Sequence, residues 1–196
     1  MAFSRSSQPS LHRVGGNLAL DFANTVSWRA TDRETDHIAT VDGLLHWAAE
    51  SGLIAGDADF PANALETARG LRNAIRTVTE AALAQEERPR EAAIILDVFR
   101  KCLESAHFDG IPARILFRAS AAEILGPIAL ATIDLLRGDM LARLKMCPQD
   151  DCHWLFLDTT KNGSRRWCDM ASCGNRAKAA HFRKRGTIGR TPLRGG

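Results

Sequence analysis

The sequence predicts an α+β protein with a predominantly helical N-terminal domain, a small hairpin within that domain, and a separate cysteine-rich segment near the C-terminal end. Three observations support this fold class. Apolar residues recur at helical spacing over most of the first 144 residues, two neighbouring runs are typical of strands, and four of the five cysteines lie within residues 147–173. The predicted organisation is a flexible tail at residues 1–12, a helical domain at 13–144, a compact module at 145–186 and a second flexible tail at 187–196.

The helical domain is predicted to contain five helices. They lie at residues 18–26, 42–50, 62–84, 90–100 and 120–144. Asn17 and Asp42 are typical N-cap residues for the first two helices, and Ile94 is expected on the buried stripe of the fourth. Pro127 is expected to kink the last helix or to lie in its first turn.

The remaining segments of this domain predict a loop and a hairpin. Residues 27–40 are polar and charged, which favours a loop. The runs LESAHFD and ARILFRA are separated by Gly110 and Pro112, and the second run places Ile115 and Phe117 on one face. This pattern predicts the one β element expected in the helical domain.

The four clustered cysteines form two pairs. Cys147 and Cys152 are separated by four residues, as are Cys168 and Cys173, and fifteen residues lie between the pairs. Two short loops that each offer two thiolates can build a tetrahedral zinc site, and four protein ligands leave no position for water, so we predict one structural Zn²⁺. Disulfides, an iron–sulfur cluster and chance are the alternatives. Cys102 lies far from the cluster and is interpreted as a buried thiol.

The residues between and after the cysteine pairs predict how this module folds. HWLFLD follows Cys152 as a short strand, Asn162-Gly163 is typical of a tight hairpin turn with positive φ at both positions, and RRW would return as the second strand. Cys173 then opens a helical run that ends at Gly186. A knuckle, a hairpin and a second ligand pair at the start of a helix resemble the treble-clef arrangement of a four-cysteine zinc finger.

Charge is unevenly distributed along the chain. From Lys145 onward, eleven Lys and Arg stand against four Asp, a net charge of +7, whereas residues 1–144 have a net charge of −4. A basic module on a mildly acidic body indicates contact with a polyanion, with a solubilising tail as the alternative. The candidate nucleic-acid-binding residues are Arg165, Arg166, Asn175, Arg176, Lys178, Arg183, Lys184 and Arg185. Asn175 and Arg176 could reach base edges, and a backbone cap is the alternative role of Asn175.

A polar arc on the first predicted helix is the candidate ligand site of the helical domain. Asp21, Asn24 and Thr25 lie on this arc, close in sequence to Gly15-Gly16, and a plain amphipathic helix is the alternative interpretation. The first 144 residues contain no phosphate-binding glycine loop, no nucleophile elbow and no H-E-x-x-H motif. We therefore assign no catalytic residue and expect the protein not to be an enzyme.

The segment CPQDDCHWLFLDTTKNGSRRWCDMASCGNRAKAAHFRKR resembles the CGNR-type zinc finger, which is named for the sequence found here at residues 173–176. The N-terminal GGNLALDFANTV and the helical region after it resemble the ABATE domain that precedes this finger in its family. The family is regarded as bacterial, stress-linked transcription regulators, with the finger assigned to DNA and the ABATE domain to ligand sensing. The resemblance implies that the four clustered cysteines are the zinc ligands.

These observations favour a one-component transcription regulator. The expected partners are double-stranded DNA, a small-molecule effector and, in a homodimer, a second copy of the chain. The alternative is a zinc-finger module that binds protein or RNA without DNA sequence specificity. The chain has no apolar run of membrane length and no apolar signal region, so a cytoplasmic location without a membrane partner is expected. Because the helical domain has no metal motif, metal removal is expected to unfold the C-terminal module alone.

Overall fold

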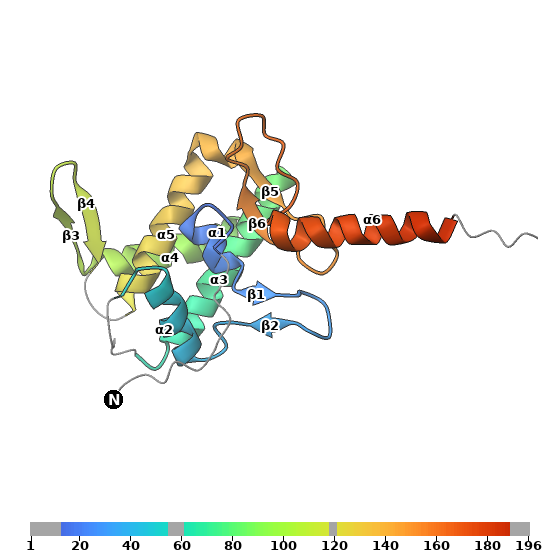
Figure 1. Cartoon of the computed structure of the whole chain (residues 1–196). Helices are drawn as coiled ribbons and strands as arrows, with labels where there is room; N and C mark the ends of the chain where they lie inside the picture. The colour runs from blue at the N-terminus through green and yellow to red at the C-terminus, as the bar shows by residue number, and fades with distance from the viewer. Residues whose placement is uncertain (1–12, 55–60, 118–120, 189–196) are drawn as a thin grey trace, which may run out of the picture.

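The computed structural model describes residues 13–54, 61–117 and 121–188, with side chains described up to Arg183. A helical bundle carries the cysteine-rich module on one side, and the last helix projects outward from that module (Figure 1). The predicted tail at residues 1–12 lies outside the described ranges, as do residues 189–196. Residues 187–188 belong to the last helix and not to a tail. None of the helices in the described ranges has the length and apolar character that a membrane span needs.

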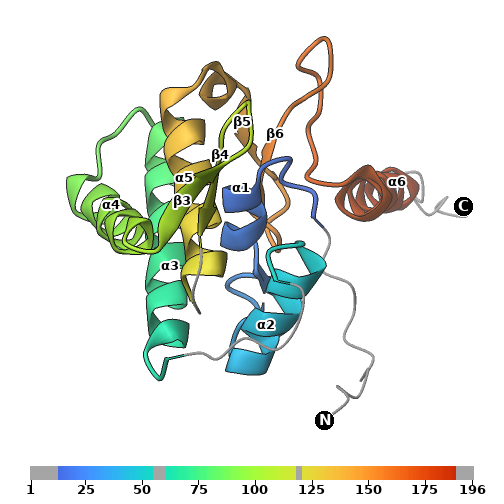
Figure 2. The same cartoon turned by 90° about the vertical axis from the view of Figure 1, so that its left-hand side faces the viewer.

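Within the described residues, the bundle contains five helices. They are α1 (Leu18–Ala23), α2 (Val41–Glu50), α3 (Ala64–Leu83), α4 (Pro89–Leu103) and α5 (Ala122–Arg137). Helix α4 packs against α3 and α5, and α1 packs against both α3 and α5, so the short first helix lies at the centre of the bundle (Figure 2). The helical class predicted from apolar spacing is confirmed.

The first two helices begin at side-chain caps. The Asn17 side chain accepts a hydrogen bond from the Ala19 N–H at 2.8 Å, as predicted. Helix α2 is capped by Thr40, whose hydroxyl accepts from the Gly43 N–H at 3.1 Å, so the predicted cap at Asp42 is wrong. Asp42 lies instead in the first turn, where its negative charge interacts favourably with the positive N-terminal end of the helix dipole.

The bundle core is centred on two aromatic rings. Phe22 and Trp47 are fully buried, with ring centroids 4.9 Å apart. Helix α4 turns Ile95 and Val98 into this core. Ile94 is 44% exposed, so its predicted place on the buried stripe is wrong.

Two antiparallel hairpins extend from the bundle. Strands β3 (Ala106–Asp109) and β4 (Arg114–Phe117) pair as predicted. Residues 27–40 are not wholly a loop, because β1 (Val26–Ser27) pairs with β2 (Thr35–Asp36). The loop between β1 and β2 lies on the same side of the bundle as the projecting last helix (Figure 1).

The predicted helix at residues 120–144 is shorter than expected. Helix α5 ends at Arg137, Gly138 is extended with φ −99° and ψ 164°, and a 3-10 turn, η1 (Asp139–Arg143), leads into strand β5 (Leu144–Met146). Pro127 lies inside α5, in its second turn. Leu144, the last residue of the predicted helix, pairs with Leu157 of a neighbouring strand. This pairing between distant residues outweighs the helical spacing of the apolar residues before it.

The cysteine-rich module contains a different hairpin from the predicted one. Strand β5 pairs with β6 (Leu155–Leu157), and residues 165–167 form no strand, so the predicted return strand RRW is wrong. Gly163 has φ +61°, but Asn162 lies outside the positive-φ region. The loop after β6 is held by polar contacts and not by a strand ladder. The buried carboxylate of Asp158 accepts from the Lys145 ammonium at 2.6 Å.

After this loop, η2 (Met170–Gly174), a π-helical turn, leads into α6 (Asn175–Ile188). Cys147 and Cys152 frame the β5–β6 turn, and Cys173 lies where α6 begins. The fold class is therefore that predicted: a helical domain with a small hairpin, followed by a treble-clef-like finger whose hairpin surrounds the first cysteine pair.

An apolar cluster joins the module to the bundle. Its members come from α1, α5, β5 and β6. They are Leu20, Leu135, Leu144, Leu155 and Leu157, and each is at most 5% exposed. Because these leucines form one buried cluster, the module is packed onto the bundle and not merely connected to it.

Candidate metal centre and nucleic-acid interface

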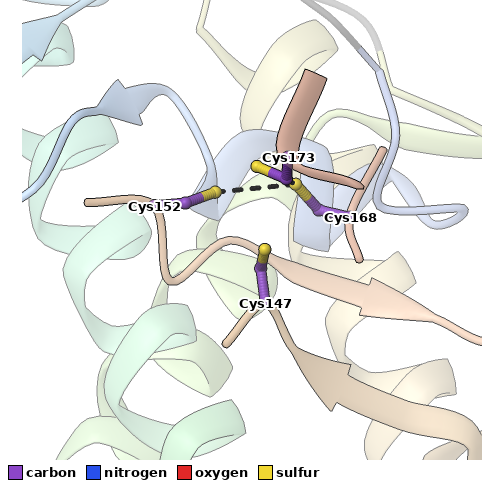
Figure 3. Close-up of side chains that lie close together, drawn as sticks. All are labelled: Cys147, Cys152, Cys168 and Cys173. Carbon is purple, nitrogen blue, oxygen red and sulfur yellow. Dashed lines mark hydrogen bonds between the residues drawn. The ribbon is translucent and has the colours of Figure 1, made fainter. Parts of the chain in front are cut away.

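The first cysteine pair lies on the turn between β5 and β6. The Cys147 N–H donates to the Trp154 carbonyl at 2.8 Å, and the Cys152 N–H donates to the Gln149 carbonyl at 3.0 Å. These two bonds close a tight knuckle. The knuckle directs both thiols to the same side of the turn (Figure 3).

The second pair is positioned by the capped turn before α6. The Asp169 carboxylate accepts hydrogen bonds from the Ala171 N–H at 3.2 Å and the Ser172 N–H at 2.8 Å. The Gly174 N–H donates to the Asp169 carbonyl at 3.1 Å. Gln149 of the knuckle donates to the Cys173 carbonyl at 2.9 Å, which joins the two ligand loops.

The four thiols converge on one point. All four Sγ atoms lie within 4.8 Å of one another, and all four cysteines are buried. Cys168 lies 3.5 Å from both Cys152 and Cys173, measured between sulfurs (Figure 3). A tetrahedral ion with metal–sulfur bonds of about 2.3 Å separates its sulfurs by about 3.8 Å. The cluster therefore has the dimensions to hold one metal ion, and none of the four cysteines is in a disulfide.

The electrostatics of the cluster favour a cation. Hydrogen bonds from the neighbouring thiols lower the pKa of Cys147, whereas the pKa of Cys168 is raised because its own proton bridges to its neighbours. Four buried thiols therefore cannot all ionise by themselves, and a bound metal would allow them to do so. The Arg176 guanidinium donates to the Cys173 sulfur at 3.2 Å, which favours the thiolate form of this cysteine.

Two family models match the chain. The model described as "Putative stress-induced transcription regulator" (ABATE) matches residues 16–139, which is more than half of the chain, and the CGNR zinc finger model matches residues 143–186. The chain belongs to the ABATE family. The resemblance stated from the sequence is confirmed for both parts. No curated protein matches the chain significantly.

The predicted ligand trio of the ABATE domain makes structural contacts. Asn24 is 3% exposed, and its amide accepts from the Leu155 N–H at 2.9 Å and donates to the Leu155 carbonyl at 2.8 Å. The buried Thr25 hydroxyl donates to the Phe22 carbonyl at 2.8 Å. Asp21 is half-buried and accepts from the Gly15 N–H at 2.8 Å. These contacts tie α1 to the N-terminal segment and to the finger.

A groove in the ABATE domain lies elsewhere. It has a volume of about 620 Å³ and is bordered by α3, α4 and the start of α5. Its lining includes Thr67, Ile94, Asp97 and Lys101, and none of the predicted trio. Cys102 also borders it and is buried, as predicted, and burial raises the pKa of this thiol to about 11.

Arg165, predicted to bind nucleic acid, is directed inward. Its guanidinium donates to the carbonyls of Val14 at 2.9 Å, Leu157 at 3.2 Å and Trp167 at 3.1 Å, and also to the Cys168 carbonyl. The same group lies 4.5 Å from the centre of the Phe156 ring. Arg165 therefore holds the finger to the N-terminal segment, and a nucleic-acid contact by this residue would require these hydrogen bonds to break.

Arg176 and Asn175 also have partners within the protein. Arg176 donates to the Asp151 carboxylate at 3.0 Å and lies 4.5 Å from the centre of the Trp28 ring. The Asn175 amide donates to the Ala171 carbonyl at 2.9 Å, which is the backbone-cap role that was the alternative for this residue. Neither side chain points to solvent without a partner, so base contact by either would require these bonds to break.

The exposed basic residues are fewer than predicted. Arg166 is exposed, with its guanidinium 5.4 Å from the centre of the Trp167 ring. Lys178 and Arg183 are exposed on α6, which projects from the finger (Figure 1). The side chains of Lys184 and Arg185 lie outside the described residues.

Sequence reasoning missed two sets of residues that position the finger. Lys145 donates to the Asp158 carboxylate and to the carbonyls of Gly163 at 2.6 Å and Arg165 at 3.0 Å, so one ammonium organises the loop after β6. The Trp154 indole N–H donates to the Val26 carbonyl at 2.9 Å and fastens the knuckle to β1. Neither contact could be predicted from the sequence, because Lys145 and Trp154 belong to no motif that indicates their partners.

Proposed function

We propose that the protein is a DNA-binding transcription regulator in which a structural Zn²⁺ holds the CGNR finger and the ABATE domain senses a small molecule. The observation that carries this proposal is a basic helix projecting from the four-cysteine cluster. Lys178 and Arg183 are exposed on α6, and Arg166 is exposed at the base of the finger. A helix rich in alanine and basic residues is slim enough to enter a groove of duplex DNA.

Zinc is the ion that the donor set favours. Four thiolates in tetrahedral arrangement suit Zn²⁺, and a site closed by four protein ligands has no position for a reacting water. The metal is therefore assigned a structural role, and no catalytic activity is proposed. Elemental analysis of the purified protein should give one zinc per chain, and cobalt substitution should give the spectrum of a tetrahedral tetrathiolate site.

Salt-dependent DNA binding tests the proposal. Fluorescence anisotropy with a random duplex should show affinity that falls steeply with salt, because each phosphate contact releases counterions. Lys178→Gln and Arg183→Gln should each weaken binding and reduce the salt slope by about 1. Lys101→Gln removes a lysine that is paired with Asp97 on α4 and should leave binding unchanged. Absent or salt-independent binding would contradict the DNA assignment.

An RNA- or protein-binding finger is a second candidate. Phe182 on α6 is 79% exposed, and an exposed ring can stack on an unpaired base or enter a protein pocket. Competition decides between the candidates. Single-stranded RNA that displaces the duplex at lower concentration than unlabelled duplex, together with loss of that preference in Phe182→Ala, would favour RNA.

A further inference from the structure

Three arginines of the ABATE domain come together outside the finger. Arg72 and Arg76 lie four residues apart on α3, on the same face, and are only 5% and 7% exposed. Arg29 approaches them from the loop between β1 and β2 and is half-buried. Burial, followed by the positive charges of Arg76 and Arg72, lowers the pKa of Arg29, so the three guanidinium groups repel one another.

The carboxylates nearby do not balance the positive charge, because Asp36 is shared between Arg72 and Arg69, and Glu34 and Glu80 are the other two that act here, so four arginines face three carboxylates. Asp36 binds Arg72 through both oxygens, at 2.6 Å and 2.9 Å, and the Glu80 carboxylate accepts from Arg76 Nε at 2.5 Å. Arg29 forms no ion pair with any described carboxylate. The Arg29 guanidinium donates a long hydrogen bond, 3.4 Å, to the Ala23 carbonyl.

Each of the three arginines also has a buried nitrogen without an acceptor. Arg29 Nε, Arg72 Nε and Arg76 Nη1 are buried and find no hydrogen-bond partner among the described residues. Buried donors are almost always satisfied in folded proteins, and an unsatisfied one on a charged group is especially unfavourable. Three such donors in one like-charged cluster therefore point to an anionic ligand.

We propose that Arg29, Arg72 and Arg76 form a binding site for a small phosphate-bearing molecule. Guanidinium groups match phosphate oxygens in geometry, and a tetrahedral phosphate can accept from donors that converge from several directions. Duplex DNA is not the source of this phosphate, because a rigid duplex cannot reach two side chains that are nine-tenths buried. This inference rests on the proposed role of the ABATE domain as a small-molecule sensor, and it specifies that the small molecule carries a phosphate group.

The backbone around Arg29 agrees with a ligand site. Trp28 has φ +55° and Ala30 has φ +59°, so two non-glycine residues on either side of Arg29 adopt the left-handed conformation. Such residues carry strain and are concentrated at ligand-binding and switch regions. Entry of a ligand requires this loop to move, and release of the strain would favour that movement.

The same loop connects the arginine cluster to the metal centre. The Trp28 ring lies 4.5 Å from the guanidinium of Arg176, which bonds the Cys173 sulfur. Arg76 contacts the Met146 sulfur at 3.7 Å, one residue before Cys147. An anion that draws Arg29 and Arg76 together therefore acts on residues that touch the finger.

Titration of the full chain with inorganic phosphate and pyrophosphate tests the proposal, using calorimetry at constant ionic strength and without DNA. We expect saturable binding that Arg29→Gln weakens at least tenfold. Arg137→Gln removes an exposed arginine paired with Asp134 on α5, carries the same charge change, and should bind as the wild type does. Because DNA is absent, the result is independent of whether the finger binds DNA.

Two outcomes would overturn the proposal. The first is the lack of saturable binding of either anion by the wild-type chain, a result that needs no variant to fold. The second is an equal loss of affinity in Arg29→Gln and Arg137→Gln, which would mean that only overall charge matters. Citrate is included at the same ionic strength, and tighter binding of citrate than of pyrophosphate would contradict the phosphate class.

Discussion

The side-chain amide of Asn24 pairs with both backbone polar groups of Leu155, accepting from its N–H at 2.9 Å and donating to its carbonyl at 2.8 Å. Asn24 ends α1 at the centre of the ABATE domain, whereas Leu155 begins β6 of the finger. The Asn24 amide thus takes the place of a neighbouring strand beside Leu155, at the edge of the finger's hairpin that faces the helical domain. The two parts of the chain therefore share buried hydrogen bonds as well as the leucine cluster.

Asn24→Ala should destabilise the whole chain. The substitution leaves the buried N–H and carbonyl of Leu155 without partners, which costs about 2–4 kcal/mol in the free energy of unfolding. Urea unfolding followed by circular dichroism measures this change. Asn63→Ala is the matched control, because Asn63 is exposed at the start of α3 and makes no side-chain cap bond. A loss of less than 1 kcal/mol in Asn24→Ala would show that the finger is only loosely attached.

Metal removal should affect more than the finger. The expectation from the sequence alone was that the helical domain would be spared, but Leu20 and Leu135 pack against leucines of β5 and β6. Loss of the finger exposes these side chains to water. After chelation, hydrogen exchange should therefore accelerate in α1 as well as in the finger, while the more distant α4 stays protected.

Single cysteine variants provide the control for metal removal. Cys147→Ser should lose the metal and reproduce the exchange pattern of the chelated protein. Cys102→Ala removes the one cysteine outside the cluster and should retain the metal. Unchanged exchange in α1 after verified metal loss would mean that the finger and the ABATE domain unfold independently.

Arg176 should affect the metal more than nucleic acid. Its guanidinium contacts the Cys173 sulfur and the Asp151 carboxylate, so it supports the ligand shell from outside. Loss of such an outer contact typically weakens metal binding 10- to 100-fold. Competition with a chromophoric chelator should show a loss of about this size in Arg176→Gln. Lys178→Gln, two residues further along α6, should leave metal affinity unchanged and reduce only nucleic-acid binding.

The elements predicted best are long helices, whose apolar spacing is repeated over many neighbouring residues. Helix α3 was predicted at residues 62–84 and spans Ala64–Leu83, because twenty residues of apolar spacing leave little ambiguity. Leu144, the first residue of strand β5, was predicted as the end of a helix. Leu144 fits either pattern, and its strand conformation depends on pairing with Leu157, thirteen residues later. Such pairing is not visible in a single short run of residues.

The candidate site also contains residues that the sequence predicts well and residues that it does not. The cysteines were found because their chemistry and spacing are recorded in the sequence, and the structure brings all four together. The basic residues were assigned by charge alone, and charge does not show which way a side chain points. Arg165 binds backbone carbonyls, whereas Lys178 is exposed, yet both contribute equally to a count of positive charge.

Asp21 gives the stability of the protein a distinctive pH dependence. Burial raises the pKa of this carboxyl to about 6, although the Gly15 N–H and the charge of Arg13 oppose the change. In the unfolded chain the pKa of an aspartate is about 3.9. Between these two values the folded state binds more protons than the unfolded state, so the contribution of Asp21 to stability is fully present below about pH 4 and is lost as the pH rises through about 6.

Asp21→Asn should remove this dependence. The amide oxygen of asparagine can still accept from the Gly15 N–H, but no charge is buried at any pH. At pH 7.5 the variant should be more stable than the wild type by about 1–2 kcal/mol, less than full conversion of the pKa shift, because the side chain is partly solvated. Thermal unfolding of both proteins from pH 4.5 to 8 gives the difference, in which acid effects on the metal centre cancel. Asp32→Asn, at an exposed position of the loop between β1 and β2, controls for the loss of one negative charge. A difference between wild type and Asp21→Asn that does not change with pH would contradict the raised pKa and leave Asp21 as a simple hydrogen-bond acceptor.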